Sequence, residues 1–320
     1  MRRLASMLLL AALAAAPALA QTTFPARPVK LVVAFPPGGS TDVTARLIAP
    51  KLAEKWGQPV VVENRPGAAA NIGTAYVARS PADGHTMLLA TTAIAISASV
   101  YDKLGYDAQK DLAPVTFVSA IPNILVVHPS VPATTVQEFV GYAKANPGKL
   151  NFAAPGAASG QRMAFELIKQ LTGTDVVVIA YKGGAPALQA VLSGEVHAMI
   201  VNVVEAVPHV QAGKLRALAT TTAKRAAMLP QVPTLAETVA PAIDVSVWQG
   251  LMVPAGTPAD VIRRINADVR DVLGDPEIRE RLTAMGMDVR PGSPDEFGRF
   301  VRDEIATWAG VAKQADIKPE

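Results

Sequence analysis

Short apolar segments alternate with amphipathic, helix-like segments along most of the chain, and this alternation limits the possible folds more than any other feature. Residues 29–35 form the first apolar segment, which ends at the turn sequence of residues 36–39. Such a segment indicates a strand buried on both faces, as in the centre of a parallel sheet. The residues that follow have apolar side chains at helical spacing and predict a helix, with N-cap chemistry supplied by Ser40, Thr41 and Asp42.

The same alternation continues towards the C-terminus and predicts an α/β fold of doubly wound parallel sheets with helices on both faces. The strands are expected at residues 29–35, 59–63, 86–91, 114–120, 123–128, 150–154, 176–181, 196–201 and 215–220. The helices after the first are expected at residues 71–79, 134–146, 161–171, 186–192, 203–212, 258–273, 276–285 and 294–313.

Two extended apolar segments, residues 121–128 and 245–254, are interpreted as crossings between two domains. A chain of 320 residues is long enough for two. Domain 1 then consists of residues 21–121 and 249–320, and domain 2 of residues 122–248. Two crossing strands make a hinge with a cleft between the lobes, which is the geometry of closure around a ligand. The alternative is one large sheet.

The first 20 residues have the pattern of a signal peptide. Arg2 and Arg3 precede the apolar residues 7–16, and an Ala-x-Ala sequence ends at Ala20. The apolar segment is too short to span a bilayer. We therefore expect cleavage after Ala20 and export to the periplasm. No cysteine follows that site, which excludes a lipoprotein anchor.

The charge of the chain gives no indication of a nucleic-acid partner. The whole chain has 30 Lys and Arg against 27 Asp and Glu, for a formal charge of +3. Two of the three units are Arg2 and Arg3 of the expected signal peptide, so the mature chain carries +1. A nearly neutral protein lacks the electrostatic footprint that nucleic-acid binding requires.

The sequence lacks the residue patterns of metal sites, cofactor sites and catalytic sites. It has no cysteine, which excludes thiolate metal sites and cysteine nucleophiles. The four histidines show neither i, i+4 pairing nor an HExxH motif. No paired nucleophile and base and no nucleotide-binding glycine motif is present. We therefore expect no cofactor, no metal and no catalytic residue.

Three loops between a predicted strand and a predicted helix have the composition of anion sites. Glycine lets backbone N–H groups approach a ligand, and a helix N-terminus adds partial positive charge. The loops lie at the C-terminal ends of parallel strands, where open α/β sheets bind ligands. Their candidate ligand-binding residues are Pro37, Gly38, Gly39, Ser40, Gly156, Ala157, Ala158, Ser159, Gly160 and Tyr181.

Asp42 and Ser159 also fit roles other than ligand binding, and these roles have to be weighed. Asp42 lies at a helix start, and we expect it to bond free N–H groups of its own first turn in preference to a ligand. Ser159 lacks glycine two residues before and two residues after it, so the loop is not a nucleophile elbow.

Longer stretches resemble the Bug (TctC-like) family, the periplasmic solute receptors of tripartite tricarboxylate transporters. The resemblance covers the whole mature chain in order, through residues 35–46 (FPPGGSTDVTAR), 61–91, 177–199, 208–225, 229–237 and 247–258. It implies a two-lobed periplasmic-binding-protein (Venus-flytrap) fold. It also implies a ligand carboxylate held between the loop after the first strand and the loop at residues 155–160. Asp42, Thr91, Arg162 and Asn202 complete the candidate ligand-binding residues.

Two departures from the family pattern bear on the ligand. Arg162 stands where family members usually have histidine, and it is either a solvated helix residue or a guanidinium that grips a carboxylate bidentately. Val201 stands where the family often has an aspartate before Asn202, and that aspartate would suit a ligand with an amino group. The departures favour a dicarboxylate or an aromatic carboxylate without an amine.

The sequence therefore predicts a periplasmic receptor that binds a small organic carboxylate and delivers it to membrane transporter subunits. One alternative is a ligand-sensing receptor that presents its closed form to the sensor kinase of a two-component system. An exported α/β enzyme is disfavoured because the chain lacks a catalytic constellation.

Overall fold

The computed structural model describes residues 24–101, 103–156, 159–181, 183–241 and 243–317. The predicted signal peptide and the candidate residues Ala157 and Ala158 lie outside these ranges. In these ranges eight strands form one hydrogen-bonded path in the order β2-β1-β3-β9-β4-β7-β5-β6, and β8 and β10, which pair with β4 off this path, bring the total to ten. The path divides into two sheets that share β4, the longest strand.

The first sheet combines a parallel part with an antiparallel part. Strand β1 pairs in parallel with β2 and β3, whereas β9 is antiparallel to both β3 and β4, and β10 is antiparallel to β4. Their bounds are β1 (Val29–Val33), β2 (Val60–Asn64), β3 (Thr86–Thr91), β4 (Leu112–Val127), β9 (Ser246–Pro254) and β10 (Asp288–Val289). The predicted parallel arrangement is present in β1, β2 and β3, but the sheet as a whole is mixed, because the returning strand β9 runs opposite to its neighbours β3 and β4.

The second sheet is built on the C-terminal part of β4. Strands β7 and β8 are antiparallel to β4, and the parallel strands β5 and β6 extend the sheet beyond β7. Their bounds are β5 (Asn151–Ala154), β6 (Val177–Ala180), β7 (Ala198–Asn202) and β8 (Arg216–Thr220).

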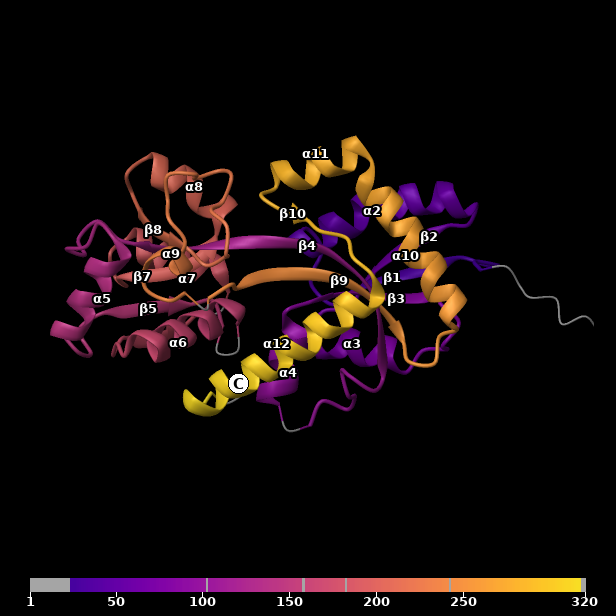
Figure 1. Cartoon of the computed structure of the whole chain (residues 1–320), viewed down its shortest axis with the longest axis horizontal. Helices are drawn as coiled ribbons and strands as arrows, with labels where there is room; N and C mark the ends of the chain where they lie inside the picture. Colours follow the sequence, from indigo (N-terminus) through magenta and orange to yellow (C-terminus); the bar gives the residue numbers. More distant parts are fainter. Residues whose placement is uncertain (1–23, 102, 157–158, 182, 242, 318–320) are drawn as a thin grey trace, which may run out of the picture.

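Helices cover both sheets (Figure 1). Those around the first sheet are α2 (Ser40–Trp56), α3 (Asn71–Ala78), α4 (Ala93–Val100), α10 (Ala259–Gly274), α11 (Pro276–Ala284) and α12 (Pro294–Gln314). Those around the second are α5 (Val136–Ala145), α6 (Gly160–Thr172), α7 (Gly184–Leu192), α8 (Val203–Gln211) and the short α9 (Leu235–Thr238). In the part of the chain that the structure describes, no helix combines the length and apolar character needed to cross a membrane.

Strand β4 belongs to both sheets and is continuous through Pro122. The sequence predicts two separate strands here, at residues 114–120 and 123–128. Proline lacks the N–H that a strand ladder needs. In the structure, Pro122 is the last β4 residue paired with β9, opposite Ser246, and Asn123 is the first paired with β7. Proline therefore occupies the point at which β4 changes partners.

The chain returns to the first sheet through β9. The backbone N–H of Val245 donates to Thr221 at 2.8 Å, and from Ser246 onwards β9 pairs with β4. The pairing with the first sheet thus begins before residue 249. Figure 1 shows β4 and β9 running side by side between the two groups of helices.

Trp248 of β9 anchors the two strands to helix α12. Its side chain is fully buried and packs edge-to-face on Phe297 and Phe300. The indole Nε1 of Trp248 donates to Oε2 of Glu304 at 2.8 Å, and Nε1 of Trp308 donates to the same oxygen at 3.0 Å. Burial raises the pKa of the Glu304 carboxyl above its ordinary value. Hydrogen bonds to Glu304 therefore join helix α12 to strand β9 within an otherwise apolar contact.

Candidate ligand-binding cleft

A cavity of about 740 Å³ lies where loops of the two sheets face each other. It is bounded by the loop after β1, by the end of β3 with the start of α4, and by the loop between β5 and α6. Its lining residues are Phe35, Pro36, Pro37, Gly39, Ser40, Thr41, Ala68, Ala69, Thr91, Thr92, Ala93, Ile96, Tyr101, Pro155, Gly156, Ser159, Gly160, Gln161 and Val247. Seven of the predicted site residues are among them: Pro37, Gly39, Ser40, Thr91, Gly156, Ser159 and Gly160.

The N-terminus of α2 enters the cleft without a side-chain cap. The N-cap residue is Gly39, and no side chain accepts a hydrogen bond from the first turn. The prediction that Ser40, Thr41 and Asp42 cap this helix is therefore wrong. The first N–H groups of an α-helix have no intrahelical acceptor, so this terminus presents donors to whatever occupies the cleft.

Asp42 stabilises the loop between β1 and α2 through hydrogen bonds but is not among the residues that line the cavity. Its buried carboxylate accepts hydrogen bonds from the backbone N–H of Gly38 at 2.9 Å, from Arg46 at 2.9 Å and from Asn64 at 2.9 Å. The bond from Arg46 is the main reason that the pKa of Asp42 lies at about 2. The expectation that Asp42 bonds its own first turn is wrong, because the carboxylate turns back to Gly38. Gly38 is not a lining residue either.

The loop before α6 is capped by Ser159. Its hydroxyl accepts from the backbone N–H of Arg162 at 3.2 Å and donates to the carbonyl oxygen of Gly156 at 3.0 Å. Gly160, the first helical residue, lies against Thr92 and Ile96 of the opposite wall. The two sides of the cleft thus meet at Gly160, and Ser159 fixes the loop beside it.

Arg162 and Tyr181 are not among the lining residues. The Nε atom of Arg162 is buried without a hydrogen-bond partner among the described residues, at 3.9 Å from Glu166. The hydroxyl of Tyr181 donates to Glu195 at 3.3 Å, and burial followed by that carboxylate raises the pKa of Tyr181.

Asn202 also lies outside the lining. Its amide nitrogen donates to Glu205 at 2.8 Å, and its amide oxygen is buried without a partner in the described part of the chain.

Sequence reasoning missed helix α4 and the wall that it forms. Thr92, at its start, accepts from the backbone N–H of Trp248 at 3.0 Å and donates to the carbonyl oxygen of Ser246 at 3.3 Å. These bonds tie α4 to the beginning of β9. Thr92 directly follows β3, so the rule that ligands bind at the carboxyl ends of strands could have identified it.

The chemistry of the cleft is that of an anion site built without full charges. None of the lining residues given above has a charged side chain. Three helices, α2, α4 and α6, place their first residues on the walls. The partial positive charge of helix N-termini favours an anion, and their N–H groups can hydrogen-bond it. Phe35, Tyr101 and Ile96 add apolar walls for the body of a small molecule.

Two sheets joined by β4 and β9, with a cleft lined by loops from both, define the class of periplasmic solute-binding receptors. Within this class, the chain belongs to the family of tripartite tricarboxylate transporter receptors. Residues 44–317 match the family described as "Tripartite tricarboxylate transporter family receptor". The predicted family, fold and receptor function are thereby confirmed, and the protein is a binding protein rather than an enzyme.

Individual relatives are similar over almost their whole length. Protein BugT of Bordetella pertussis is 38% identical over 298 residues, which cover 92% of this chain and 91% of BugT. The structure of R. palustris Rpa4515 with adipate is 39% identical, with a TM-score of 0.79, over 93% of this chain and all (100%) of that one. MatC from Rhodopseudomonas palustris, with bound malate, is 34% identical, with a TM-score of 0.75, over 90% of this chain and 99% of MatC.

Proposed function

We propose that this receptor binds a small organic dicarboxylate in the cleft and delivers it to the membrane subunits of a tripartite tricarboxylate transporter. The observation that carries the proposal is the set of three helix N-termini on the walls of a cleft whose described lining has no charged side chain. Neutral donors can satisfy a carboxylate without a fixed counter-charge, which allows the ligand to be released again.

Two solved relatives support the choice of a dicarboxylate, since one structure contains adipate and the other malate. The lining itself argues against an amino acid. A buried ammonium group needs a carboxylate or several acceptors, and the described lining offers no acidic side chain. An amine would therefore add a desolvation cost with no matching partner.

The proposal includes closure of two lobes, residues 21–121 with 249–320 and residues 122–248, after removal of the signal peptide at Ala20. Strands β4 and β9 would serve as the hinge, because each runs from one side of the cleft to the other. Arg162 would move towards the ligand on closure. Support comes from its buried Nε without a partner among the described residues.

A thermal-shift and calorimetric screen of the mature chain tests the proposal, with adipate, malate, benzoate and glutamate as probes. At 100 times its dissociation constant, a specific ligand should stabilise the protein by about 2.7 kcal/mol. We expect adipate or malate to raise the melting temperature and glutamate to leave it unchanged. A shift with glutamate alone, or no shift with any probe, contradicts the proposed ligand class.

Two variants locate the binding site. Ala93→Phe places a ring in the cleft and should abolish the shift. Arg162→Gln removes the guanidinium, and we expect weaker binding by about tenfold, the cost of one charge-assisted hydrogen bond. The matched control is Arg263→Gln on the exposed surface of α10, which should bind as the unaltered protein does. Equal binding by Arg162→Gln and the control would exclude Arg162 from the site.

A further inference from the structure

Gln249 of β9 carries a buried polar group that no other described residue satisfies. The residue is 1% exposed, and neither Nε2 nor Oε1 of its amide has a hydrogen-bond partner in the described part of the chain. A flip of the amide would not change this, because both atoms lack a partner. Buried polar groups in folded proteins are almost always hydrogen-bonded, so an amide with both atoms unpaired points to a partner from outside the chain.

The register of the first sheet places Gln249 next to the ligand cleft. Gln249 pairs with Thr91 of β3 on one side and with Ser119 of β4 on the other. Residues directly opposite each other on antiparallel strands project from the same face, and so does Val247, two residues earlier in β9. Both Thr91 and Val247 line the cleft. The amide of Gln249 therefore lies beside two residues of the cleft wall.

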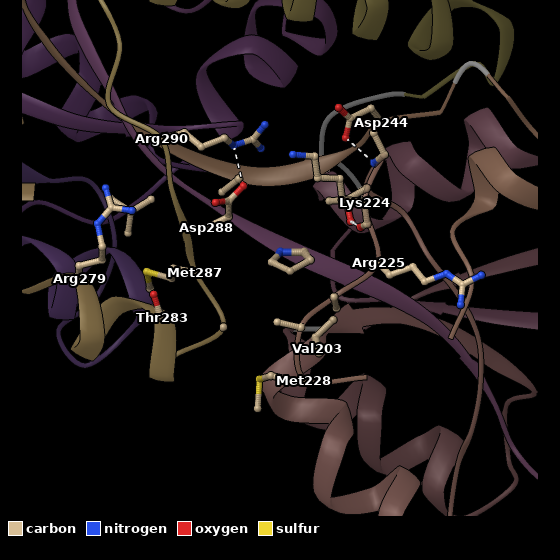
Figure 2. A pocket seen from close by; sticks show the side chains of 18 residues that line it. Val203, Lys224, Arg225, Met228, Asp244, Arg279, Thr283, Met287, Asp288 and Arg290 are labelled. Carbon is tan, nitrogen blue, oxygen red and sulfur yellow. Dashed lines mark hydrogen bonds and ion pairs between the residues drawn. The ribbon is translucent and has the colours of Figure 1, made fainter. Parts of the chain in front are cut away.

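The opposite end of this row of side chains is closed. The Oγ atom of Ser119 lies 3.7 Å from Sδ of Met287, and Oγ1 of Thr44 lies 3.5 Å from the same sulfur. Figure 2 shows Met287 near Thr283 of α11, on the wall of a separate cavity of about 470 Å³ at the hinge. Ser119 and Met287 thus stand between Gln249 and that cavity, whereas Thr91, its direct neighbour, borders the ligand cleft.

Helix α2 brings its N-terminus over the same row. Ser40 and Thr41, its first residues, line the cleft, and Thr44 of the next turn reaches the row through its contact with Met287. The free N–H groups at the start of α2 favour a carboxylate. A ligand carboxylate bound there has its neighbouring substituent on the side of Gln249.

The chemistry of a primary amide restricts what that substituent can be. The NH₂ group of the amide donates and its carbonyl oxygen accepts. A carboxylate only accepts and leaves Oε1 of Gln249 unpaired, whereas an ammonium group only donates and leaves Nε2 unpaired. A hydroxyl group beside a carboxylate satisfies both atoms, because the hydroxyl donates to Oε1 while an oxygen of the same ligand accepts from Nε2.

We propose that Gln249 is a specificity-determining residue of the cleft and selects dicarboxylates that carry a hydroxyl group next to a carboxylate. The proposal rests on the dicarboxylate-receptor function proposed above. The long, unbranched side chain of Gln249 reaches the ligand past Thr91 by a change of rotamer, while β9 keeps its pairing. A site built to bind a hydroxyl rejects the analogue without it, since its own polar group is then left unpaired.

Isothermal titration of the mature chain with malate and succinate tests the proposal, because the two ligands differ only in the hydroxyl group. We expect the unaltered protein to bind malate about tenfold more tightly than succinate. Gln249→Met replaces the amide with an apolar group of similar length. It should bind malate about tenfold more weakly than the unaltered protein does and should bind succinate unchanged.

The matched control is Ser119→Ala, which removes a buried hydroxyl from the same row on the side away from the cleft. It should keep the preference for malate. Thermal unfolding of the ligand-free proteins gives a second readout. Gln249→Met should melt at the same temperature as the unaltered protein or higher, since it removes a polar group that has no partner.

The outcomes separate this role of Gln249 from the receptor function. Equal affinities of the unaltered protein for malate and succinate, or a preference for malate that persists in Gln249→Met, overturn the role and leave a dicarboxylate receptor. A clear fall in the melting temperature of Gln249→Met also overturns it, because the amide would then be satisfied within the fold. Absence of binding of malate, succinate and adipate contradicts the receptor function itself, and the role of Gln249 with it.

Discussion

At the scale of single residues, the cleft depends on a carboxylate that does not line it. Asp42 is 3% exposed, and its bonds to Gly38, Arg46 and Asn64 hold the loop that carries Gly39 and Ser40. A carboxylate used in this way leaves the N–H groups at the start of α2 free for a ligand. The loop is thus braced from outside the cleft.

We predict that Asp42→Asn lowers the free energy of unfolding by about 1–3 kcal/mol at neutral pH, since it removes charge-assisted hydrogen bonds inside the fold. The pKa of Asp42 is lowered in the folded protein, from 3.8 to about 2. Its stabilisation is therefore complete above pH 4 and is lost as the pH falls towards 2. Denaturant unfolding of both proteins between pH 7 and 2 should show the difference shrinking in that window.

The exposed Asp303→Asn serves as the control for this experiment and should follow the unaltered protein at every pH. If the gap between Asp42→Asn and the unaltered protein stayed constant down to pH 2, the carboxylate charge would not be its source.

The sequence indicates the glycine loops of the site because glycine and proline have local meaning. Pro37, Gly39 and Gly156 are placed on the cavity wall by the same turn chemistry that makes them conspicuous in the sequence. The part played by Asp42 depends on Asn64, which belongs to another strand. Contacts across such a separation follow from the fold and leave no local pattern.

At the scale of elements, two differences from the sequence prediction have clear physical causes. Helix α4 has no side-chain cap, no acidic residue in its first turn and no basic residue in its last turn, so it lacks the usual start and stop signals. Strand β4 is expected from the sequence as two strands, at residues 114–120 and 123–128, yet it continues through Pro122 because its pairing partner changes there. In both cases tertiary contacts, rather than the local sequence, determine the secondary structure.

The contact between β9 and α12 leads to a sharp prediction. A Cβ on Gly250 would overlap with the ring of Phe297. Gly250→Ala should therefore lower the free energy of unfolding by about 1–3 kcal/mol, as overpacking of a core does. The matched control is Gly310→Ala inside α12, where a Cβ meets nothing within 4 Å. It should stabilise by about 0.5–1 kcal/mol. Equal stabilities of the two variants in urea unfolding would contradict this packing.

The carboxyl of Glu304, which accepts hydrogen bonds from Trp248 and Trp308, should make the free energy of unfolding depend on pH. Because burial raises the pKa of this carboxyl in the folded protein, the folded state binds the proton more tightly than the unfolded chain. Glu304 therefore stabilises the folded state most at low pH. This stabilisation is lost as the pH rises above 4.5, the ordinary pKa of a glutamate. Glu304→Gln keeps an acceptor for both indoles and should remove this slope in unfolding experiments between pH 4.5 and 8.

Glu304→Ala provides the contrast. It leaves the indole N–H groups of Trp248 and Trp308 without their acceptor, so it should be less stable than Glu304→Gln by about 1–3 kcal/mol. If the unaltered protein and Glu304→Gln changed in parallel with pH, titration of Glu304 would not contribute to stability.

At the scale of the whole molecule, the proposed closure moves one sheet against the other about the two crossing strands, β4 and β9. We predict that a saturating dicarboxylate ligand decreases the radius of gyration measured by small-angle X-ray scattering, since closure brings the lobes together. The variant Ala93→Phe, with its cleft filled, should show no ligand-dependent change. An unchanged radius of gyration for the unaltered protein at saturation would argue for a rigid receptor.

The position of β9 in the first sheet also determines the order in which the two sheets can form. Strand β9 lies between β3 and β4, although it is made long after both. As the chain emerges N-terminus first, the facing edges of β3 and β4 stay unpaired until residue 254 is available, and unpaired edges are templates for aggregation. The second sheet needs no strand beyond Thr220. All strands of the second sheet are therefore made before the strand that joins β3 to β4 in the first sheet.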